Sequence, residues 1–301
     1  MSSMARSVVK KLINRRSVSM VAAATLVGAG LTACTATETD EDANHLETLQ
    51  EQGTVTVGFA GEAPYSFEEG GELTGATVAL HREIFSNLGI ETVEGVNADF
   101  GALIPGLQAN RFDVVSAGMS ILPERCEQAA FSDPEFNYTT ALMVEEGNPL
   151  DLTDMQSVAE ADVQLATMTG AIESDYADSL GLDSMQVATP QDGMDAVTSG
   201  RADVFALTGI SLNWMADNNP DAPVEVTESF VAEIDGVPQV GAGGTVFRTE
   251  DQELLEAYNE ELSRITSDPE TYLSIVGEFG FTEAELPDPE LTTEDLCAGD
   301  I

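Results

Sequence analysis

Residues 112–126 of this 301-residue chain read FDVVSAGMSILPERC, and this stretch decides the fold class. Its first half, Phe112 to Ala117, is apolar with two adjacent valines, which predicts a buried strand. The second half, from Gly118 to Cys126, is then the loop that leaves the end of that strand. Because α/β sheets place ligands at strand ends, Arg125 is a candidate anchor for a carboxylate. The alternative is a surface arginine paired with a neighbouring glutamate.

Strand and helix patterns alternate on both sides of this stretch. We expect strands at 54–60, 91–96, 112–117, 163–168, 185–188 and 202–208, separated by helices at 78–88, 100–110, 174–180 and 191–199. The turn 110–114 (Asn-Arg-Phe-Asp-Val) is echoed by 200–204 (Gly-Arg-Ala-Asp-Val). This repeat of form predicts an α/β fold of two lobes, each built on a doubly wound sheet and joined by a two-strand hinge.

The predicted lobes are discontinuous in sequence. A strand over 241–248 returns the chain to the first lobe, and helices follow at 251–266 and 269–279. We therefore assign residues 46–143 and 241–301 to lobe 1, and residues 144–240 to lobe 2.

The charge of the chain is extreme. Its formal net charge is −43, and all residues after Lys11 together contain 54 acids but no lysine. Such a surface repels nucleic acid and anionic membranes, which argues against a phosphate-binding role. It is typical of a protein that works in high salt, where screening limits the repulsion between its own charges. The alternative is that acidity is common to proteins of the lineage, keeps them soluble and has no specific function.

The first 33 residues form a predicted lipoprotein signal peptide. A basic segment ending in Arg15-Arg16 precedes an apolar run from Val18 to Thr32, and Leu31-Thr32-Ala33-Cys34 resembles a bacterial lipobox, in which the Cys carries the lipid. Ordinary secretion and twin-arginine export both remain open. Residues 34–45 then form an acidic tether, so we expect an exported protein anchored by Cys34 to the outer face of the cytoplasmic membrane.

Several motifs together resemble the bacterial extracellular solute-binding proteins of the polar amino acid class, which serve ABC importers. They are Val55 to Phe67, Leu103-Ile104-Pro105-Gly106-Leu107 with Arg111-Phe112-Asp113, and Gly118 to Arg125 followed by Ala130-Phe131-Ser132-Asp133-Pro134. Within that class, Gly58 to Tyr65, Val93 to Val96, Pro123 to Cys126 and Phe279 to Pro287 look like the ectoine and hydroxyectoine binders. The resemblance implies capture of a small zwitterionic solute between the lobes and delivery to a membrane permease. A binder of another polar amino acid or a betaine-like solute is the alternative.

The resemblance also implies the ligand-binding residues. Arg125 would hold the ligand carboxylate beside backbone groups of Gly118 and Ser120, while Glu62 would accept N–H groups of the cationic ring. Aromatic faces would come from Tyr65 and Phe100. Ser120 stands where the ectoine binders carry a third aromatic residue. From lobe 2 we expect backbone N–H groups of Gly170 and Ile172, and Thr208 stands where α-amino-acid binders carry an Asp for the α-ammonium group.

The remaining cysteines are expected to pair. With Cys34 lipidated, Cys126 and Cys297 are the other two thiols, and export favours a disulfide; two free buried thiols are the alternative. We predict a monomeric binding protein without cofactor or metal. We also expect no catalytic residues, because neither His45 nor His81 falls on a strand-end loop. A dehydratase using Glu62 or Glu173 as acid or base is the enzymatic alternative.

Overall fold

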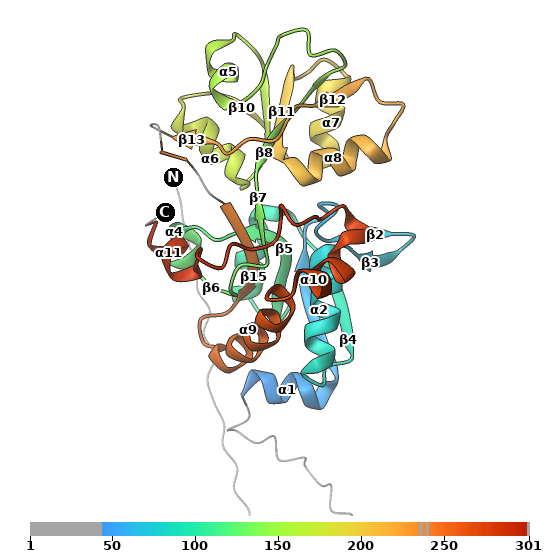
Figure 1. Ribbon diagram of the computed structural model, residues 1–301, viewed down its shortest axis with the longest axis vertical. Helices are drawn as coiled ribbons and strands as arrows, with labels where there is room; N and C mark the ends of the chain where they lie inside the picture. Colours follow the sequence, from blue (N-terminus) through green and yellow to red (C-terminus); the bar gives the residue numbers. More distant parts are fainter. Residues whose placement is uncertain (1–43, 235–236, 239–240, 300–301) are drawn as a thin grey trace, which may run out of the picture. The chain divides into compact units, whose positions relative to one another are not determined.

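The structure is a computed structural model that describes residues 44–234, 237–238 and 241–299. These residues lie in one compact unit of the chain, Asp42–Ile301. The predicted signal peptide, Cys34 and most of the predicted tether lie outside the described residues. Two main sheets organise the unit, and Figure 1 shows one lobe around each. The predicted two-lobed α/β fold is confirmed.

The sheet of lobe 1 has the strand order β4-β1-β5-β15-β6, and β7 also pairs with β15. Strand β1 is parallel to β4 and β5, whereas β15 runs antiparallel to its partners. The strands are β1 (Thr54–Phe59), β4 (Thr92–Asn97), β5 (Val114–Ser120), β6 (Ala130–Phe131), β7 (Phe136–Tyr138) and β15 (Gly241–Phe247), with a hairpin of β2 (Phe67–Glu69) and β3 (Glu72–Thr74).

The helices of this lobe pack on both sides of its sheet (Figure 1). They are α1 (His45–Gln52), α2 (Ala76–Asn87), α3 (Leu103–Gln108), α4 (Pro123–Cys126), α9 (Gln252–Thr266), α10 (Pro269–Val276) and α11 (Thr293–Ala298), with short 3₁₀ turns at η1 (Phe100–Ala102) and η2 (Gly277–Phe279). The prediction of a plain loop after the central strand was wrong in one respect. Strand β5 continues to Ser120, and Arg125 lies in the helical turn α4, whose first residue is a proline that suits a helix start.

The sheet of lobe 2 has the order β10-β9-β11-β8-β12. Its strands are β8 (Thr140–Glu145), β9 (Leu165–Met168), β10 (Ser184–Val187), β11 (Val204–Thr208) and β12 (Val224–Val226). Its helices are α5 (Met155–Glu160), α6 (Ile172–Ser179), α7 (Pro190–Thr198) and α8 (Gly209–Asn218). The short strands β13 (Glu233–Ile234) and β14 (Val237–Pro238) pair with each other.

The chain crosses between the two sheets in two places. Tyr138 ends β7 in the first sheet and Thr140 begins β8 in the second, while the return crossing leads from β12 to β15. We predicted that lobe 1 extends to residue 143, but β8 pairs with β11 from Thr140 onward. A continuous extended run carries no signal of where its pairing partner changes, so the change of sheet comes earlier than predicted.

The echoed turns have the same structural cause in both lobes. The carboxylate of Asp113 accepts from the Thr56 N–H at 2.8 Å, and that of Asp203 accepts from the Gln164 N–H at 2.7 Å. Each aspartate also donates its own N–H to the carbonyl of the same partner residue. The motif therefore fastens the start of one strand to the start of its parallel neighbour, in β1–β5 and again in β9–β11.

His45 belongs to the fold and not to the tether. It is the first residue of α1, and its ring lies 3.1 Å from the Asp113 carboxylate and 3.0 Å from that of Asp251. Burial opposes protonation of this imidazole, but the hydrogen bonds with the two carboxylates raise the pKa of His45 to about 9. The charged ring thus ties α1 to the body of lobe 1.

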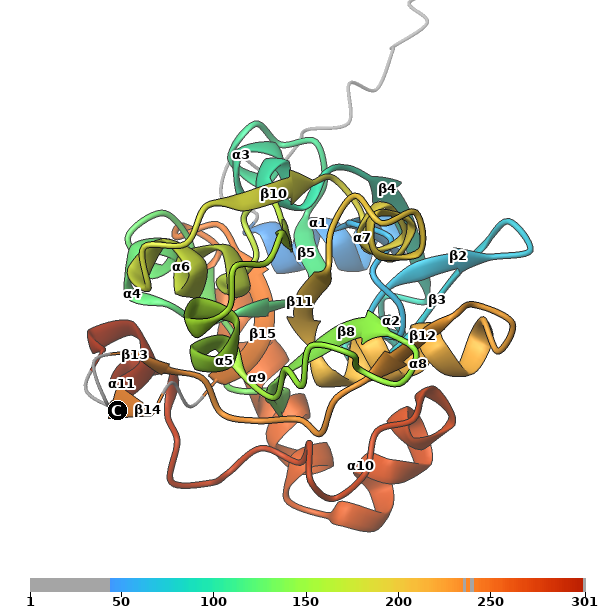
Figure 2. The ribbon, with the colours of Figure 1, turned by 90° about the horizontal axis from the view of Figure 1, so that it is seen from above.

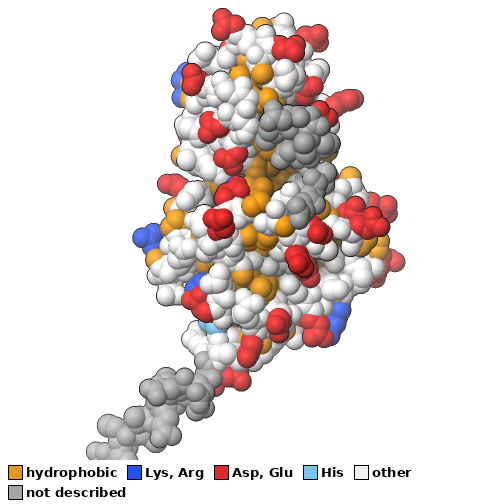
Figure 3. All heavy atoms as spheres, turned by 90° about the vertical axis from the view of Figure 1, so that its left-hand side faces the viewer, with side chains coloured by type: hydrophobic (Ala, Val, Ile, Leu, Met, Phe, Trp, Pro, Cys, Tyr) orange, Lys and Arg blue, Asp and Glu red, His pale blue; other side chains and the backbone are white. Residues whose placement is uncertain are grey.

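Acidic side chains are spread over the surface. In Figure 3 the Asp and Glu side chains are scattered across the visible face and far outnumber the Lys and Arg side chains. No helix in the described part of the chain is long and apolar enough to cross a membrane.

Candidate functional site

Arg125 is buried where the two lobes meet. Its side chain is 8 % exposed, and its guanidinium donates to the carbonyl of Ser120 at 3.0 Å and to that of Gly170, on lobe 2, at 2.8 Å. No ion pair joins it to an acidic residue among those described. Arg125 is therefore not a surface arginine paired with a glutamate, and its remaining N–H groups are available to an anion.

Glu62 reaches the same region from the loop after β1. It is 4 % exposed, and its Oε1 accepts from the Ser211 hydroxyl, on α8 of lobe 2, at 2.7 Å. The Thr208 hydroxyl lies at 3.5 Å from the same oxygen. Burial raises the pKa of Glu62 to about 7, although these two hydroxyls favour the charged form. We call the region between Arg125 and Glu62 the interlobe site.

Aromatic rings line the lobe 1 side of the interlobe site. Tyr65 is buried against Phe136, with ring centroids 5.1 Å apart, and its hydroxyl has no hydrogen-bond partner among the residues that the structure describes. Gly118 has a φ of +56° and lies under this ring; a Cβ there would come within 2.5 Å of Tyr65. Only glycine meets both conditions. The Phe100 ring packs under the Arg125 guanidinium, whose central carbon is 5.7 Å from the ring centroid.

The other predicted site residues are also close to this point, but some have different contacts from those expected. Gly170 offers its carbonyl to Arg125, and Ser120 does the same from lobe 1. Thr208 ends β11, and its hydroxyl donates to that of Ser211 at 3.0 Å. The same hydroxyl faces Glu62 of lobe 1 at 3.5 Å. Ile172 is buried at the first turn of α6.

Three polar side chains of the interlobe site were not predicted as ligand-binding residues from the sequence. Ser211 supplies the direct hydrogen bond to Glu62. Tyr138, at the crossing between the sheets, is buried, and within the described part of the chain its hydroxyl has no hydrogen-bond partner. Glu173, weighed above only as a catalytic acid or base, is fully buried on α6. The signal that could have found Glu173 is its place directly after the loop that carries Gly170 and Ile172.

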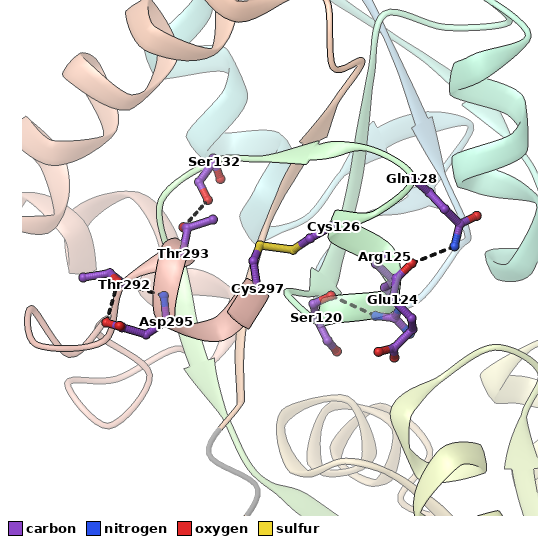
Figure 4. Close-up of a disulfide and its surroundings, with 10 residues drawn as sticks. All are labelled: Ser120, Glu124, Arg125, Cys126, Gln128, Ser132, Thr292, Thr293, Asp295 and Cys297. Atoms are coloured by element: carbon purple, nitrogen blue, oxygen red, sulfur yellow. Dashed lines mark hydrogen bonds between the residues drawn. A yellow bond between two sulfur atoms is a disulfide. The ribbon is translucent and has the colours of Figure 1, made fainter. Parts of the chain in front are cut away.

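A disulfide lies next to Arg125. Cys126 on α4 and Cys297 on α11 are bonded, with their Cα atoms 5.7 Å apart (Figure 4). The same figure shows Thr293 of the tail donating to the carbonyl of Ser132. The C-terminal helix is thereby joined to the turn that positions Arg125.

The described residues contain no cluster of three or more His, Cys, Asp or Glu side chains arranged to hold a metal ion. The chemistry of the interlobe site is instead that of ion pairing and hydrogen bonding: one guanidinium, buried carboxylates, hydroxyls and aromatic faces. This combination suits a small ligand that carries both an anionic and a cationic group.

Comparison with known proteins agrees with this chemistry. Residues 55–277 match the family of bacterial extracellular solute-binding proteins, family 3. The chain belongs to this family. A probable amino-acid ABC transporter periplasmic-binding protein of Sinorhizobium fredii is 33 % identical over 260 residues, covering 84 % of this chain and 86 % of that protein. The lysine/arginine/ornithine-binding periplasmic protein of Escherichia coli is 25 % identical over 224 residues, covering 68 % and 79 %.

Solved structures of such proteins share the fold. The crystal structure of EhuB in complex with hydroxyectoine is similar with a TM-score of 0.75 and 32 % identity, covering 84 % of this chain and 98 % of EhuB. An ancestral arginine-binding protein bound to arginine has a TM-score of 0.65 and 28 % identity, covering 75 % and 98 %. The sequence-based assignment to the solute-binding proteins, rather than to an enzyme class, is confirmed by the family match.

Proposed function

We propose that this protein is the lipid-anchored solute-binding component of an ABC importer and captures ectoine or hydroxyectoine between its lobes. The observation that carries the proposal is that Arg125 and Glu62, which have opposite charges, are buried in one interlobe site without pairing with each other. A zwitterion with separate carboxylate and cationic ends would satisfy both. The similarity to EhuB, which was solved with hydroxyectoine, supports the choice of ligand.

The form of the cation also favours ectoine. Its amidinium ring is flat and delocalised, so it gains from aromatic faces as well as from an acceptor. Tyr65 and Phe100 supply such faces, and each contact contributes about 0.5–2 kcal/mol. Thr208 offers only a hydroxyl at the position where α-amino-acid binders carry an Asp. The alternative ligand is another polar amino acid, and the arginine-binding relatives make arginine the first to compare.

Calorimetric titration in molar salt tests the ligand. We expect ectoine or hydroxyectoine to bind more tightly than glycine betaine, glutamine or arginine. Trp214, the only tryptophan of the chain, provides a second signal because it lies between Phe67 and Phe279 of lobe 1, with ring centroids 5.9 and 6.4 Å away. Figure 2 shows its helix α8 beside the β2–β3 hairpin. Tighter binding of arginine or glutamine would contradict the ectoine assignment but leave the family intact.

The anchor is proposed to be a lipid on Cys34. A Cys34→Ser variant is expected to leave the membrane fraction, because the acidic domain itself has no attraction for anionic lipid. The measurement is the distribution of the protein between membranes washed in molar salt and the medium, with mass spectrometry of the N-terminal peptide. Equal membrane retention of the variant and the unmodified protein would exclude a lipid anchor at this residue.

A further inference from the structure

A second buried carboxylate reaches the interlobe site from lobe 2. Glu173 is the second residue of α6 and is 0 % exposed. Its Oε1 has one weak contact, 3.5 Å from the Thr140 hydroxyl, and its Oε2 has no hydrogen-bond partner among the described residues. Most buried carboxylates are paired or hydrogen-bonded, because burial of an unpaired charge costs several kcal/mol. This oxygen therefore lacks a partner that a bound ligand can supply.

The groups around Glu173 do not balance its charge. Glu62 faces it from lobe 1 and further raises its pKa, which burial already raises to about 8. Arg125 opposes this shift, but it donates to two backbone carbonyls and forms no ion pair with any acid that the structure describes. Tyr138 and Tyr176 also lie within its field, and both are neutral at ordinary pH because burial raises their pKa values. The site thus holds two carboxylates and one guanidinium.

We propose that Glu62 and Glu173 act together as acceptors, one from each lobe, for a planar N–C–N cation of the ligand, while Arg125 binds the ligand's carboxylate. Each carboxylate would take a different N–H of an amidinium or guanidinium group. This inference rests on the proposed function and specifies its ligand class: carboxylic acids that carry an amidinium or a guanidinium.

With this arrangement, a cation with N–H groups is expected to bind more tightly than other cations. A quaternary ammonium has no N–H and leaves both carboxylates without a donor, so the cost of burying them remains. A delocalised N–C–N cation presents N–H groups on two sides and can satisfy acceptors that approach from different lobes. Glu173 is thereby a specificity residue, and the repulsion between the two carboxylates favours closure only around a cation.

The test is the Glu173→Gln variant of the full-length protein, with Asp178→Asn as a matched control. Asp178 is an exposed acid on the same helix, so its replacement removes a carboxyl group from α6 without removing a group of the site. Ectoine and glycine betaine are titrated in molar salt, because both are zwitterions of zero net charge and only ectoine has N–H groups on its cation. We expect Glu173→Gln to reduce the affinity for ectoine by at least about tenfold. The affinity of Glu173→Gln for glycine betaine and the affinity of Asp178→Asn for ectoine should each change by less than about twofold.

Thermal unfolding of the ligand-free proteins separates a binding role from a structural one. Glu173→Gln should unfold at the same temperature as the wild type or higher, because it removes a buried carboxyl group whose raised pKa makes ionisation unfavourable in the folded state. A lower midpoint together with weaker ectoine binding would mean that Glu173 is structural, and unchanged ectoine affinity would also overturn the proposal. If the wild type binds arginine but not ectoine, the proposed function fails and the same comparison is made with arginine against citrulline. Binding of neither ectoine nor arginine would overturn both.

Discussion

Arg125→Ala is expected to weaken binding of any carboxylate ligand by at least about tenfold, or 1.4 kcal/mol. A charge-assisted hydrogen bond from a guanidinium contributes about 1.5–3 kcal/mol, and the loss falls directly on affinity because the ligand carboxylate would be buried without a partner. The variant also loses the 2.8 Å bond to the Gly170 carbonyl, which joins the lobes. Both effects weaken the closed, ligand-bound form.

The measurement is a calorimetric titration, with the fluorescence of Trp214 as a record of contact between the lobes. Arg201→Ala is the matched control, since Arg201 is an exposed arginine on lobe 2 whose side chain, among the described residues, donates only to Ser199. The affinity of Arg201→Ala for the ligand should equal that of the wild type. The affinity of Arg125→Lys should lie between those of the wild type and Arg125→Ala, because the lysine ammonium keeps the charge but loses the planar geometry of the guanidinium. Unchanged affinity in Arg125→Ala would show that Arg125 does not bind the ligand.

Local patterns were sufficient to predict most of the fold. The β-branched runs, the helical spacing and the echoed turns around Asp113 and Asp203 each depend on neighbours close in sequence, and the structure confirms the elements they predicted. The point where β7 gives way to β8 was misplaced, because pairing partners far apart in the chain decide it. His45 was misplaced for the same reason: its partner Asp251 comes more than two hundred residues later.

The interlobe site was predictable only in part. Arg125 and Glu62 were identified because each was expected on a strand-end loop and carries a charge that fits a zwitterion. Glu173, Tyr138 and Ser211 lie inside a helix, at the end of a strand and inside another helix, where a polar residue is usually solvated or structural. Their importance depends on how the lobes meet, and no local pattern encodes that.

Replacing both Cys126 and Cys297 with serine is expected to reduce the free energy of unfolding by about 2–4 kcal/mol. The disulfide closes a loop across a sequence separation of 171 residues, which includes all of the lobe 2 sheet. Without this link the unfolded chain gains conformational freedom, and the folded form becomes less stable by comparison. Guanidinium unfolding in molar salt measures the change. A thiol count on denatured, unreduced wild-type protein is the control: two reactive thiols would show that the bridge does not form.

The loss of stability in the serine variant depends on how firmly the C-terminal helix α11 packs on lobe 1 without the disulfide. Helix α11 keeps its N-cap at Thr292, the buried side chain of Leu296 and the bond from Thr293 to the Ser132 carbonyl. If these contacts are weak, the tail detaches locally before the lobe unfolds, and proteolysis will cut it early in the serine variant but not in the wild type. Because α4 carries Arg125 beside Cys126, such detachment should also weaken ligand binding. A serine variant with unchanged unfolding midpoint, protease resistance and affinity would mean that the disulfide stabilises neither the tail nor the site.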